Sequence, residues 1–255
     1  MLTRIAAFSY GLACYAVFFA TFLYAIGFVG NIGVPKAMDS GPRSPLVTSL
    51  LVDCALLALF AVQHSLMARP WFKQHWTRIV PQPLERSTYV LFSSLALILL
   101  FWQWRPLGGV IWDVSGTGAA MVMMAVYGFG WALLLLSTFM IDHFDLFGLR
   151  QVWLYLKGRP YEHPRFHTPG LYAQVRHPIY LSWMIIFWAA PVMTAAHLLF
   201  AFMTTAYMLI AIQWEERDLI TMHGQAYVRY RKEVPMLLPA VRTSSADRTE
   251  SAVRP

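Results

Sequence analysis

The fold is decided by the longest apolar stretch of the chain, residues 178–214, PIYLSWMIIFWAAPVMTAAHLLFAFMTTAYMLIAIQW. It contains no Asp, Glu, Lys or Arg, and it is much longer than the roughly 20 apolar residues that one membrane crossing needs. Pro191 lies near its middle and interrupts a helix because proline lacks the backbone donor. We therefore predict a tight helical hairpin with arms 178–190 and 195–214, of which the first arm is short.

Four more apolar stretches precede the hairpin, at residues 6–33, 46–67, 87–104 and 117–141. The whole chain of 255 residues is 58% hydrophobic and only 13% charged, whereas about a quarter of the residues in soluble domains are charged. The first stretch is too long for the apolar core of a signal peptide, so we expect it to be retained as a span. The sequence predicts an all-α integral membrane protein with five to six transmembrane helices.

The basic residues predict how this protein lies in its membrane. If the amino terminus is cytoplasmic, 17 of the 20 Lys and Arg residues fall in cytoplasmic segments, and only Lys36, Arg43 and Arg105 fall outside. Such a bias is typical of the cytoplasmic loops of membrane proteins. We predict a multi-pass inner-membrane protein with both termini in the cytoplasm. The orientation of the protein in the membrane then accounts for the net charge of +7. We expect no nucleic acid partner and no obligate protein partner.

The predicted organisation has three parts. Residues 1–141 form an amino-terminal region of four spans. Residues 142–240 contain a long cytoplasmic loop (142–177), the hairpin and an amphipathic helix over 215–239 that is expected to end at Pro235 and to cap the loop. Residues 241–255 are small, polar and charged, which predicts a disordered tail.

Acidic and basic residues gather at the cytoplasmic ends of the hairpin. Pro178 suits the first turn of a helix, so Arg176 and His177 lie just before a helix amino terminus, where free N–H groups favour an anion. The hairpin brings Glu215 and Glu216 to the same level. A zwitterionic or cationic ligand would match these two walls. The alternative interpretation is that the arginines only anchor the helices and pair with the glutamates.

These residues also carry a resemblance to a known superfamily. The pattern Arg176-His177-Pro178-x-Tyr180, a hairpin, Glu215-Glu216 and then Gly224-x-x-Tyr227-x-x-Tyr230 before Val234-Pro235 resembles the isoprenylcysteine carboxyl methyltransferase and phospholipid methyltransferase superfamily. The resemblance covers roughly residues 165–240. It implies that S-adenosylmethionine binds on the cytoplasmic side beneath the last helix. The residues that it implies for cofactor binding are Gln174, Arg176, His177, Tyr180, Glu215, Glu216 and Tyr227.

Three earlier segments narrow the resemblance to one family. They are QHSLMARP (63–70), ERSTY (85–89) and DHFDLFGLRQ (142–151). Together with the carboxy-terminal half they are similar to the bacterial methanethiol S-methyltransferases and their NnrU-like neighbours. This resemblance implies an enzyme that methylates methanethiol, a small volatile thiol, to dimethyl sulfide. The thiol is expected to enter from the membrane or the periplasmic side.

Transfer of a methyl group to a thiol requires a base, because burial raises the pKa of a thiol. His64 is a candidate because ionisable groups within a span usually face an interior cavity. His143 is a second candidate, since the neighbouring carboxylates are expected to raise its pKa. Asp142 could relay a proton through water. No metal is required. For His64 and His143, bonds between helices or contacts with lipid headgroups are the structural alternatives.

Three other functions stay open at this point. The same fold could methylate a lipid amine or a prenylcysteine, which would need a wide lateral groove. The chain could instead bind haem with His64 and His143 as axial ligands, and a Soret band would show this. A non-catalytic membrane protein of the NnrU type would not bind S-adenosylmethionine.

Overall fold

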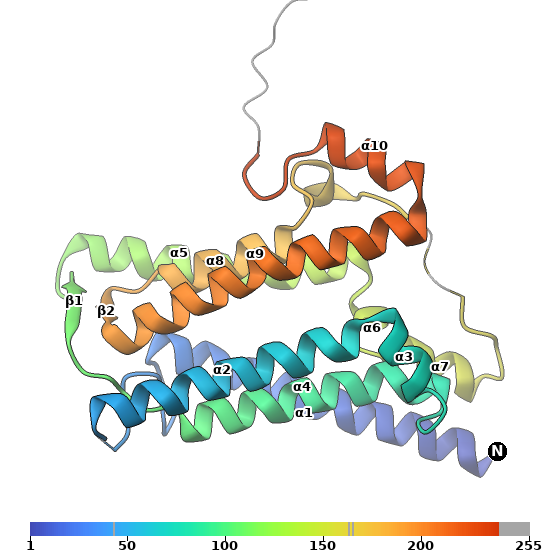
Figure 1. Ribbon diagram of the computed structural model, residues 1–255, viewed down its shortest axis with the longest axis horizontal. Coiled ribbons are helices and arrows are strands. Elements are labelled where there is room, and N and C mark those ends of the chain that lie inside the picture. Colours follow the sequence, from blue (N-terminus) through green and yellow to red (C-terminus); the bar gives the residue numbers. More distant parts are fainter. Residues whose placement is uncertain (43, 163, 165, 240–255) are drawn as a thin grey trace, which may run out of the picture.

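The computed structural model describes residues 1–42, 44–162, 164 and 166–239. The predicted disordered tail, 241–255, lies outside these residues. Long helices run side by side along the molecule, and short helices gather at one end (Figure 1). The helices longer than 20 residues are α1 (Leu2–Gly30), α2 (Leu46–Ala68), α4 (Gln82–Gln103), α5 (Gly118–Ile141) and α9 (Ala195–His223).

These five helices are each long and apolar enough to cross a membrane, which confirms the predicted multi-span α fold. The predicted spans agree with them to within a few residues at most ends. α1 ends earlier than expected, at Gly30, because Asn31 adopts a left-handed conformation (φ 54°) and its backbone N–H bonds to the carbonyl of Gly27. Asparagine is one of the few residues other than glycine that tolerate this conformation.

The hairpin is formed by α8 (Pro178–Trp188) and α9, with Pro191 in the connection. α8 has 11 residues, about 16 Å at 1.5 Å per residue. That length is about half of a hydrocarbon core of roughly 30 Å, so α8 is too short to cross a bilayer alone.

The prediction of a separate amphipathic helix over 215–239 is wrong in its first half. α9 continues through both glutamates to His223, and Gly224 (φ 57°, ψ −134°) then turns the chain into α10 (Gln225–Glu233). Only glycine adopts these backbone angles readily. α10 ends two residues before Pro235, which restricts the backbone that precedes it. Because α9 is not interrupted, Glu215 and Glu216 sit on a long, continuous helix.

Two features of the connections were not predicted. The short strands β1 (Val110–Asp113) and β2 (Val192–Thr194) pair antiparallel, joining the turn before α5 to the turn of the hairpin. The loop 142–177 is also more regular than expected, because it contains α6 (His143–Leu146), α7 (Leu149–Leu156) and the 3₁₀ helix η1 (Gly170–Ala173). The division of the chain at residues 141 and 240 stays a prediction.

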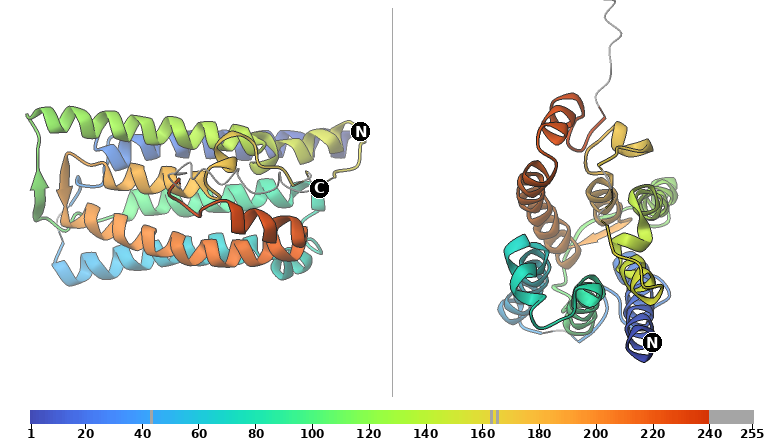
Figure 2. Two further views of the ribbon diagram at one scale, coloured as in Figure 1. Left: turned by 90° about the horizontal axis from the view of Figure 1, so that it is seen from above. Right: turned by 90° about the vertical axis from the view of Figure 1, so that its right-hand side faces the viewer.

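The long helices form two groups. α4 packs against α1 and α2, and α8 packs against α5 and α9, while α2 and α9 contact each other more sparsely across the seam between the groups. Figure 2 shows this arrangement from above and, on the right, along the long axis of the bundle. Buried aromatic side chains fill the interior, among them Phe28, Trp104 and Phe200.

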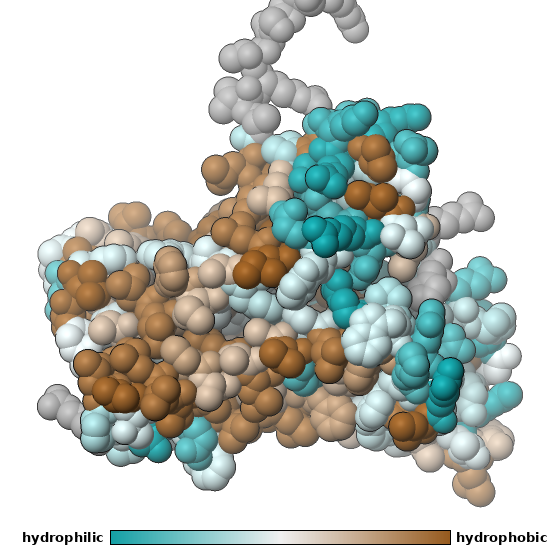
Figure 3. All heavy atoms as spheres, in the orientation of Figure 1, coloured by the Kyte–Doolittle hydropathy of each residue, from teal (hydrophilic) through white to brown (hydrophobic). Residues whose placement is uncertain are grey.

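The two ends of the bundle differ in polarity. One end, which we call the basic end, holds the N-terminus, α3 (Pro70–Trp76), α6, α7 and α10; β1 and β2 lie at the opposite end, the strand end (Figures 1 and 2). Hydrophilic side chains gather over α10 and the rest of the basic end, whereas the remainder of the face seen in Figure 3 is mostly hydrophobic. Large side chains such as Leu51, Val122 and Phe202 are more than 60% exposed. Such a surface fits lipid rather than water.

Candidate active site

The charged residues that the sequence places near the start of α8 meet on one glutamate. Arg176 Nε donates to Glu216 Oε1 at 2.7 Å, and His177 Nε2 lies 3.2 Å from the same oxygen. Glu216 is 3% exposed. Its carboxylate is therefore compensated by a guanidinium and an imidazole that come from the far side of the hairpin, as a buried charge requires.

α10 is fastened to the same glutamate. Arg231 Nε lies 3.2 Å from Glu216 Oε2, and Arg176 Nη1 donates to the carbonyls of Arg231 and Val234. The backbone N–H groups of Arg176 and His177 donate to the carbonyls of Pro235 and Met236. We call Arg176, His177, Glu216 and Arg231 the Glu216 clasp. It ties the start of α8, the end of α9 and α10 into one unit.

The neighbouring glutamate has a different environment. Glu215 is half-buried, and within the described part of the chain it accepts one hydrogen bond, from Tyr180 Oη at 2.8 Å. Four further tyrosines lie within electrostatic range of its carboxylate: Tyr89, Tyr172, Tyr207 and Tyr227. We call these five the tyrosine group. It comes from α4, η1, α8, α9 and α10, so it spans the seam.

Two members of the tyrosine group lie outside the spans, Tyr172 and Tyr227, and both stay protonated. Burial raises the pKa of Tyr172, and the charge of Glu215 adds to this. Burial likewise raises the pKa of Tyr227, where Glu216 and Glu215 add to it. Tyr227 is 2% exposed, and its ring packs against those of Phe166 and Tyr230. Both hydroxyls are hydrogen-bond donors at neutral pH, and that of Tyr172 donates to the carbonyl of Ser137 at 3.4 Å.

Among the residues predicted to bind the cofactor, six lie in the Glu216 clasp, in the tyrosine group or at Glu215. The seventh, Gln174, directly follows η1 and has an exposed side chain. The guanidinium of Arg176 is already engaged by Glu216 and by α10 carbonyls. The pairing of an arginine with a glutamate, which the sequence left as an alternative, is therefore what the geometry shows for these two side chains.

His64 lies beside the tyrosine group. The hydroxyl of Tyr89 is 2.9 Å from His64 Nε2 and 3.0 Å from Nδ1, and Ser93 Oγ is 3.2 Å from Nδ1. The ring of Phe60 stacks on the imidazole with centroids 5.1 Å apart. The adjacent Ser65 shares a hydrogen bond of 2.9 Å with Tyr207 across the seam. The α2–α4 side and the α8–α9 side of the molecule thus meet next to His64, at the hydrogen bond between Ser65 and Tyr207.

His143 lies in a different cluster. Its Nε2 is 2.8 Å from the hydroxyl of Tyr15 and its Nδ1 is 2.9 Å from Thr138 Oγ1. The ring stacks on Phe139 at 4.3 Å and is 4% exposed. Both ring nitrogens are engaged by neutral hydroxyls.

The expectation that carboxylates raise the pKa of His143 is wrong. Burial lowers the pKa of this histidine and outweighs the opposing effect of Asp142. Asp142 has a positive φ of 104°, and its carboxylate accepts from the N–H of Asp145 and pairs with Arg150 at 3.3 Å. Asp142 and His143 are adjacent in sequence, but no hydrogen bond joins their side chains within the described part of the chain.

Sequence reasoning missed Tyr207, Tyr172 and Arg231. For Tyr207 a signal was present: it precedes Glu215 by eight residues, close to two helical turns, so both lie on one face of α9. Arg231 follows Tyr227 by four residues, which places both near one side of α10. No local pattern marks Tyr172, because its position depends on how η1 folds back over α10, where its carbonyl accepts from Tyr230.

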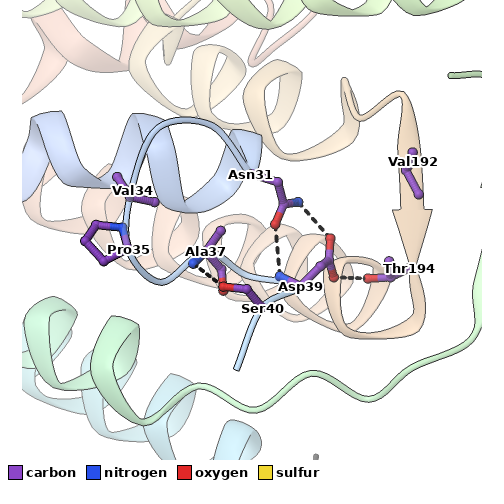
Figure 4. Close-up of a pocket in the computed structure, with 8 residues that line it drawn as sticks. All are labelled: Asn31, Val34, Pro35, Ala37, Asp39, Ser40, Val192 and Thr194. Carbon is purple, nitrogen blue, oxygen red and sulfur yellow. Dashed lines mark hydrogen bonds between the residues drawn. The ribbon is translucent and has the colours of Figure 1, made fainter. Parts of the chain in front are cut away.

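A separate hollow of about 430 Å³ opens at the strand end. Figure 4 shows its lining, which is Asn31, Val34, Pro35, Ala37, Asp39, Ser40, Val192 and Thr194. Asn31 Nδ2 donates to Asp39 at 2.7 Å, and the Thr194 hydroxyl donates to the other oxygen of the same carboxylate. These polar groups bond to each other and fasten the α1–α2 connection to the start of α9. The hollow is far from the Glu216 clasp, at the opposite end of the bundle.

Comparison with known proteins gives the chain a family. It is 52% identical to the methanethiol S-methyltransferase of Crocosphaera subtropica, over 94% of either chain. It is 55% identical to methanethiol S-methyltransferase 1 of Bradyrhizobium diazoefficiens, over 91% of this chain and 82% of that one. Nurim of Xenopus laevis is a more distant relative, 32% identical over 76% of this chain and 69% of its own.

No protein-family model matches the chain, and no solved structure does. The relatives at 52% and 55% identity are matched over 94% and 91% of this chain, so the similarity is not confined to its carboxy-terminal half. They therefore confirm the family that the segments 63–70, 85–89 and 142–151 predicted. The chain belongs to the methanethiol S-methyltransferase family.

Proposed function

We propose that this protein is an enzyme that transfers a methyl group from S-adenosylmethionine to methanethiol and so forms dimethyl sulfide. The names of its relatives support this acceptor. The observation that carries the proposal is the Glu215 carboxylate, half-buried beside Tyr180 and covered by α10, with His64 across the seam. A cationic ligand and a small apolar one could meet there.

The residues present fit S-adenosylmethionine. Its sulfonium and ammonium groups are positive, and a carboxylate flanked by tyrosine rings favours cations. Glu215, Tyr180 and Tyr227 would provide these contacts. Arg176, His177 and Glu216 would shape the wall and hold α10 over it. Gln174, exposed at the end of η1, would lie at the rim. These roles rest on the arrangement of this chain's own side chains.

His64 is the base that we propose for the thiol. S-adenosylmethionine supplies, when bound, an electrophilic methyl group on a positively charged sulfur. His64 accepts the S–H proton, and the electron pair of that bond stays on the thiol sulfur. That pair forms the new S–CH₃ bond as the bond between methyl and the donor sulfur breaks. His143 and Asp142 remain the alternative base and relay, but His64 is favoured because it adjoins the tyrosine group.

We place the basic end on the cytoplasmic side of a bacterial inner membrane, where a polar donor is available. The thiol would enter from the lipid or from the periplasmic side. A reporter fused to the carboxy terminus tests this orientation. Green fluorescent protein fused there should fluoresce and alkaline phosphatase should be inactive, and the reverse pair of results would overturn the orientation.

The activity is tested with membranes that contain the full-length protein. Incubation with S-adenosylmethionine and methanethiol should release dimethyl sulfide into the headspace, measured by gas chromatography. The matched control is the same preparation of Glu215→Ala. A prenylcysteine and a phospholipid amine serve as competing acceptors. Methylation of either of these without dimethyl sulfide would overturn the choice of acceptor, and failure to bind S-adenosylmethionine in calorimetry would overturn the transferase itself.

A further inference from the structure

Three sequence segments that lie far apart in the chain are linked through Arg86 and its neighbour Tyr89 on α4. Arg86 Nε donates to the carbonyl of Leu146 at 2.7 Å, and its guanidinium carbon lies 4.9 Å from the centre of the Tyr89 ring. The hydroxyl of Tyr89 in turn reaches His64. We propose that Arg86 is a positioning residue, which fixes Tyr89 and through it the imidazole of His64; this rests on the proposed function.

The anchor of Arg86 is rigid. Leu146 ends α6, whose first turn is capped by the carboxylate of Asp142. Gly148 follows with φ 87°, and a Cβ there would lie 2.7 Å from the backbone nitrogen of Ser87. Ser87 Oγ donates to the carbonyl of Gly148 at 3.2 Å. This corner therefore fixes the start of α4 and the carbonyl that holds Arg86.

The His64 end of this series of contacts is also constrained. Phe60 covers one face of the His64 ring, and Ser93 lies within hydrogen-bond distance of Nδ1. Tyr89 is 6% exposed, so its ring has little freedom once Arg86 lies on it. A base that must meet a small thiol needs a fixed direction, because a methyl-sized substrate offers few contacts that could correct a misplaced ring.

The shape of the Arg86 side chain suits this positioning role. A planar guanidinium can stack on an aromatic ring and donate sideways at the same time, which the ammonium of lysine cannot do.

The test compares Arg86→Met and Arg86→Lys with the wild type in full-length, membrane-embedded protein. We expect kcat for methanethiol to fall on the order of tenfold or more in Arg86→Met and less in Arg86→Lys. The KM for S-adenosylmethionine should stay within about twofold in both, because the Glu216 clasp and Glu215 are untouched. The exposed Arg78, in the loop before α4, provides the control Arg78→Met, which should behave as the wild type.

Two outcomes would overturn the role. One is a folded Arg86→Lys variant with the kcat of the wild type and an equal kcat for Arg86→Met. The other is a rise in the KM for S-adenosylmethionine that matches the loss of kcat/KM, which would indicate a general structural defect. If Arg86→Met does not fold, Arg86→Lys alone decides. Absence of dimethyl sulfide with the wild type would instead overturn the proposed function, together with this role.

Discussion

Two buried histidines near the basic end of the bundle have different environments, although each follows a charged residue in the sequence. His177, in the Glu216 clasp, and His143, in the corner of α5 and α6, are each 4% exposed. His177 contacts the carboxylate of Glu216, 39 residues away. His143 directly follows an aspartate, yet it contacts the hydroxyls of Tyr15 and Thr138. Closeness in sequence to a carboxylate therefore says little about the charge that a buried histidine meets.

The cause lies in the backbone at each site. Pro178 begins α8, so the side chains of Arg176 and His177 precede a helix start, where the hairpin returns Glu216 to them. At the corner, Asp142 takes a positive φ of 104° and turns its carboxylate toward the first turn of α6 and Arg150. The clasp is thus an ionic assembly, whereas the corner is a neutral, aromatic one.

The largest effect should come from breaking the ionic assembly. Glu216→Ala leaves Arg176, whose side chain is 10% exposed, and His177 without their common partner. Removing one member of a buried ionic pair typically costs about 3–5 kcal/mol. We expect a loss of this size in the free energy of unfolding, measured by thermal or denaturant unfolding in detergent micelles. Glu216→Gln should lose less because it keeps an acceptor oxygen.

Glu233→Ala is the control, since Glu233 is an exposed glutamate at the end of α10. It should change stability by under about 0.5 kcal/mol, as surface substitutions usually do. A loss below about 1 kcal/mol in Glu216→Ala would mean that the clasp is not an ionic assembly that the fold depends on.

The second prediction concerns the backbone of the corner. Gly148→Ala places a Cβ 2.7 Å from the backbone nitrogen of Ser87 and at a φ of 87°. The conformation costs about 1–2 kcal/mol and the overpacking about 1–3 kcal/mol more. Gly116→Ala is the matched control, because Gly116 has a φ of 77° with nothing within 4 Å of the added Cβ. Equal losses in the two variants would show that the close approach to Ser87 is tolerated.

Much of the fold could be predicted, because membrane spans follow from composition and length alone. The hairpin followed from Pro191 and the absence of charge in 178–214. The meeting of Arg176 with Glu216 followed in turn, since a hairpin must return its second arm to the start of the first. The end of α9 was misplaced because the change from apolar to charged residues at Glu215 looks like a helix boundary, although the backbone there is regular until Gly224.

The environment of His143 could not be predicted for a different reason. Tyr15 is on α1, and nothing in the local pattern at 142–151 shows that α1 packs there. The same holds for the role of Arg86, whose acceptor is a backbone carbonyl 60 residues away. Contacts set by the packing of distant helices need the three-dimensional arrangement.

A third prediction separates the two adjacent glutamates. Glu215 accepts only the hydrogen bond from Tyr180 within the described residues, so Glu215→Gln should change the free energy of unfolding by about 1 kcal/mol or less. If this carboxylate meets the positive groups of S-adenosylmethionine, the affinity for the cofactor should fall about tenfold, which corresponds to about 1.4 kcal/mol. Calorimetric titration measures it. Tyr180→Phe, which keeps the charge, should lose less affinity, and an unchanged affinity in Glu215→Gln would remove this residue from the binding site.

The smallest effect is the pH dependence that His143 contributes. Burial holds the pKa of His143 below the ordinary histidine value of 6.5, so the unfolded chain binds a proton there at a pH at which the folded protein does not. Stability from this residue is therefore complete above pH 6.5 and decreases as the pH falls from 6.5 toward the folded pKa. We expect His143→Gln, whose amide can still bond to Tyr15 or Thr138, to unfold with a weaker dependence on pH between 7 and 5 than the wild type. His75→Gln is the control, because His75 is exposed on α3 and should leave the slope unchanged. The same slope in all three proteins would show that His143 accepts a proton without cost, and the corner would then resemble the ionic surroundings of His177 after all.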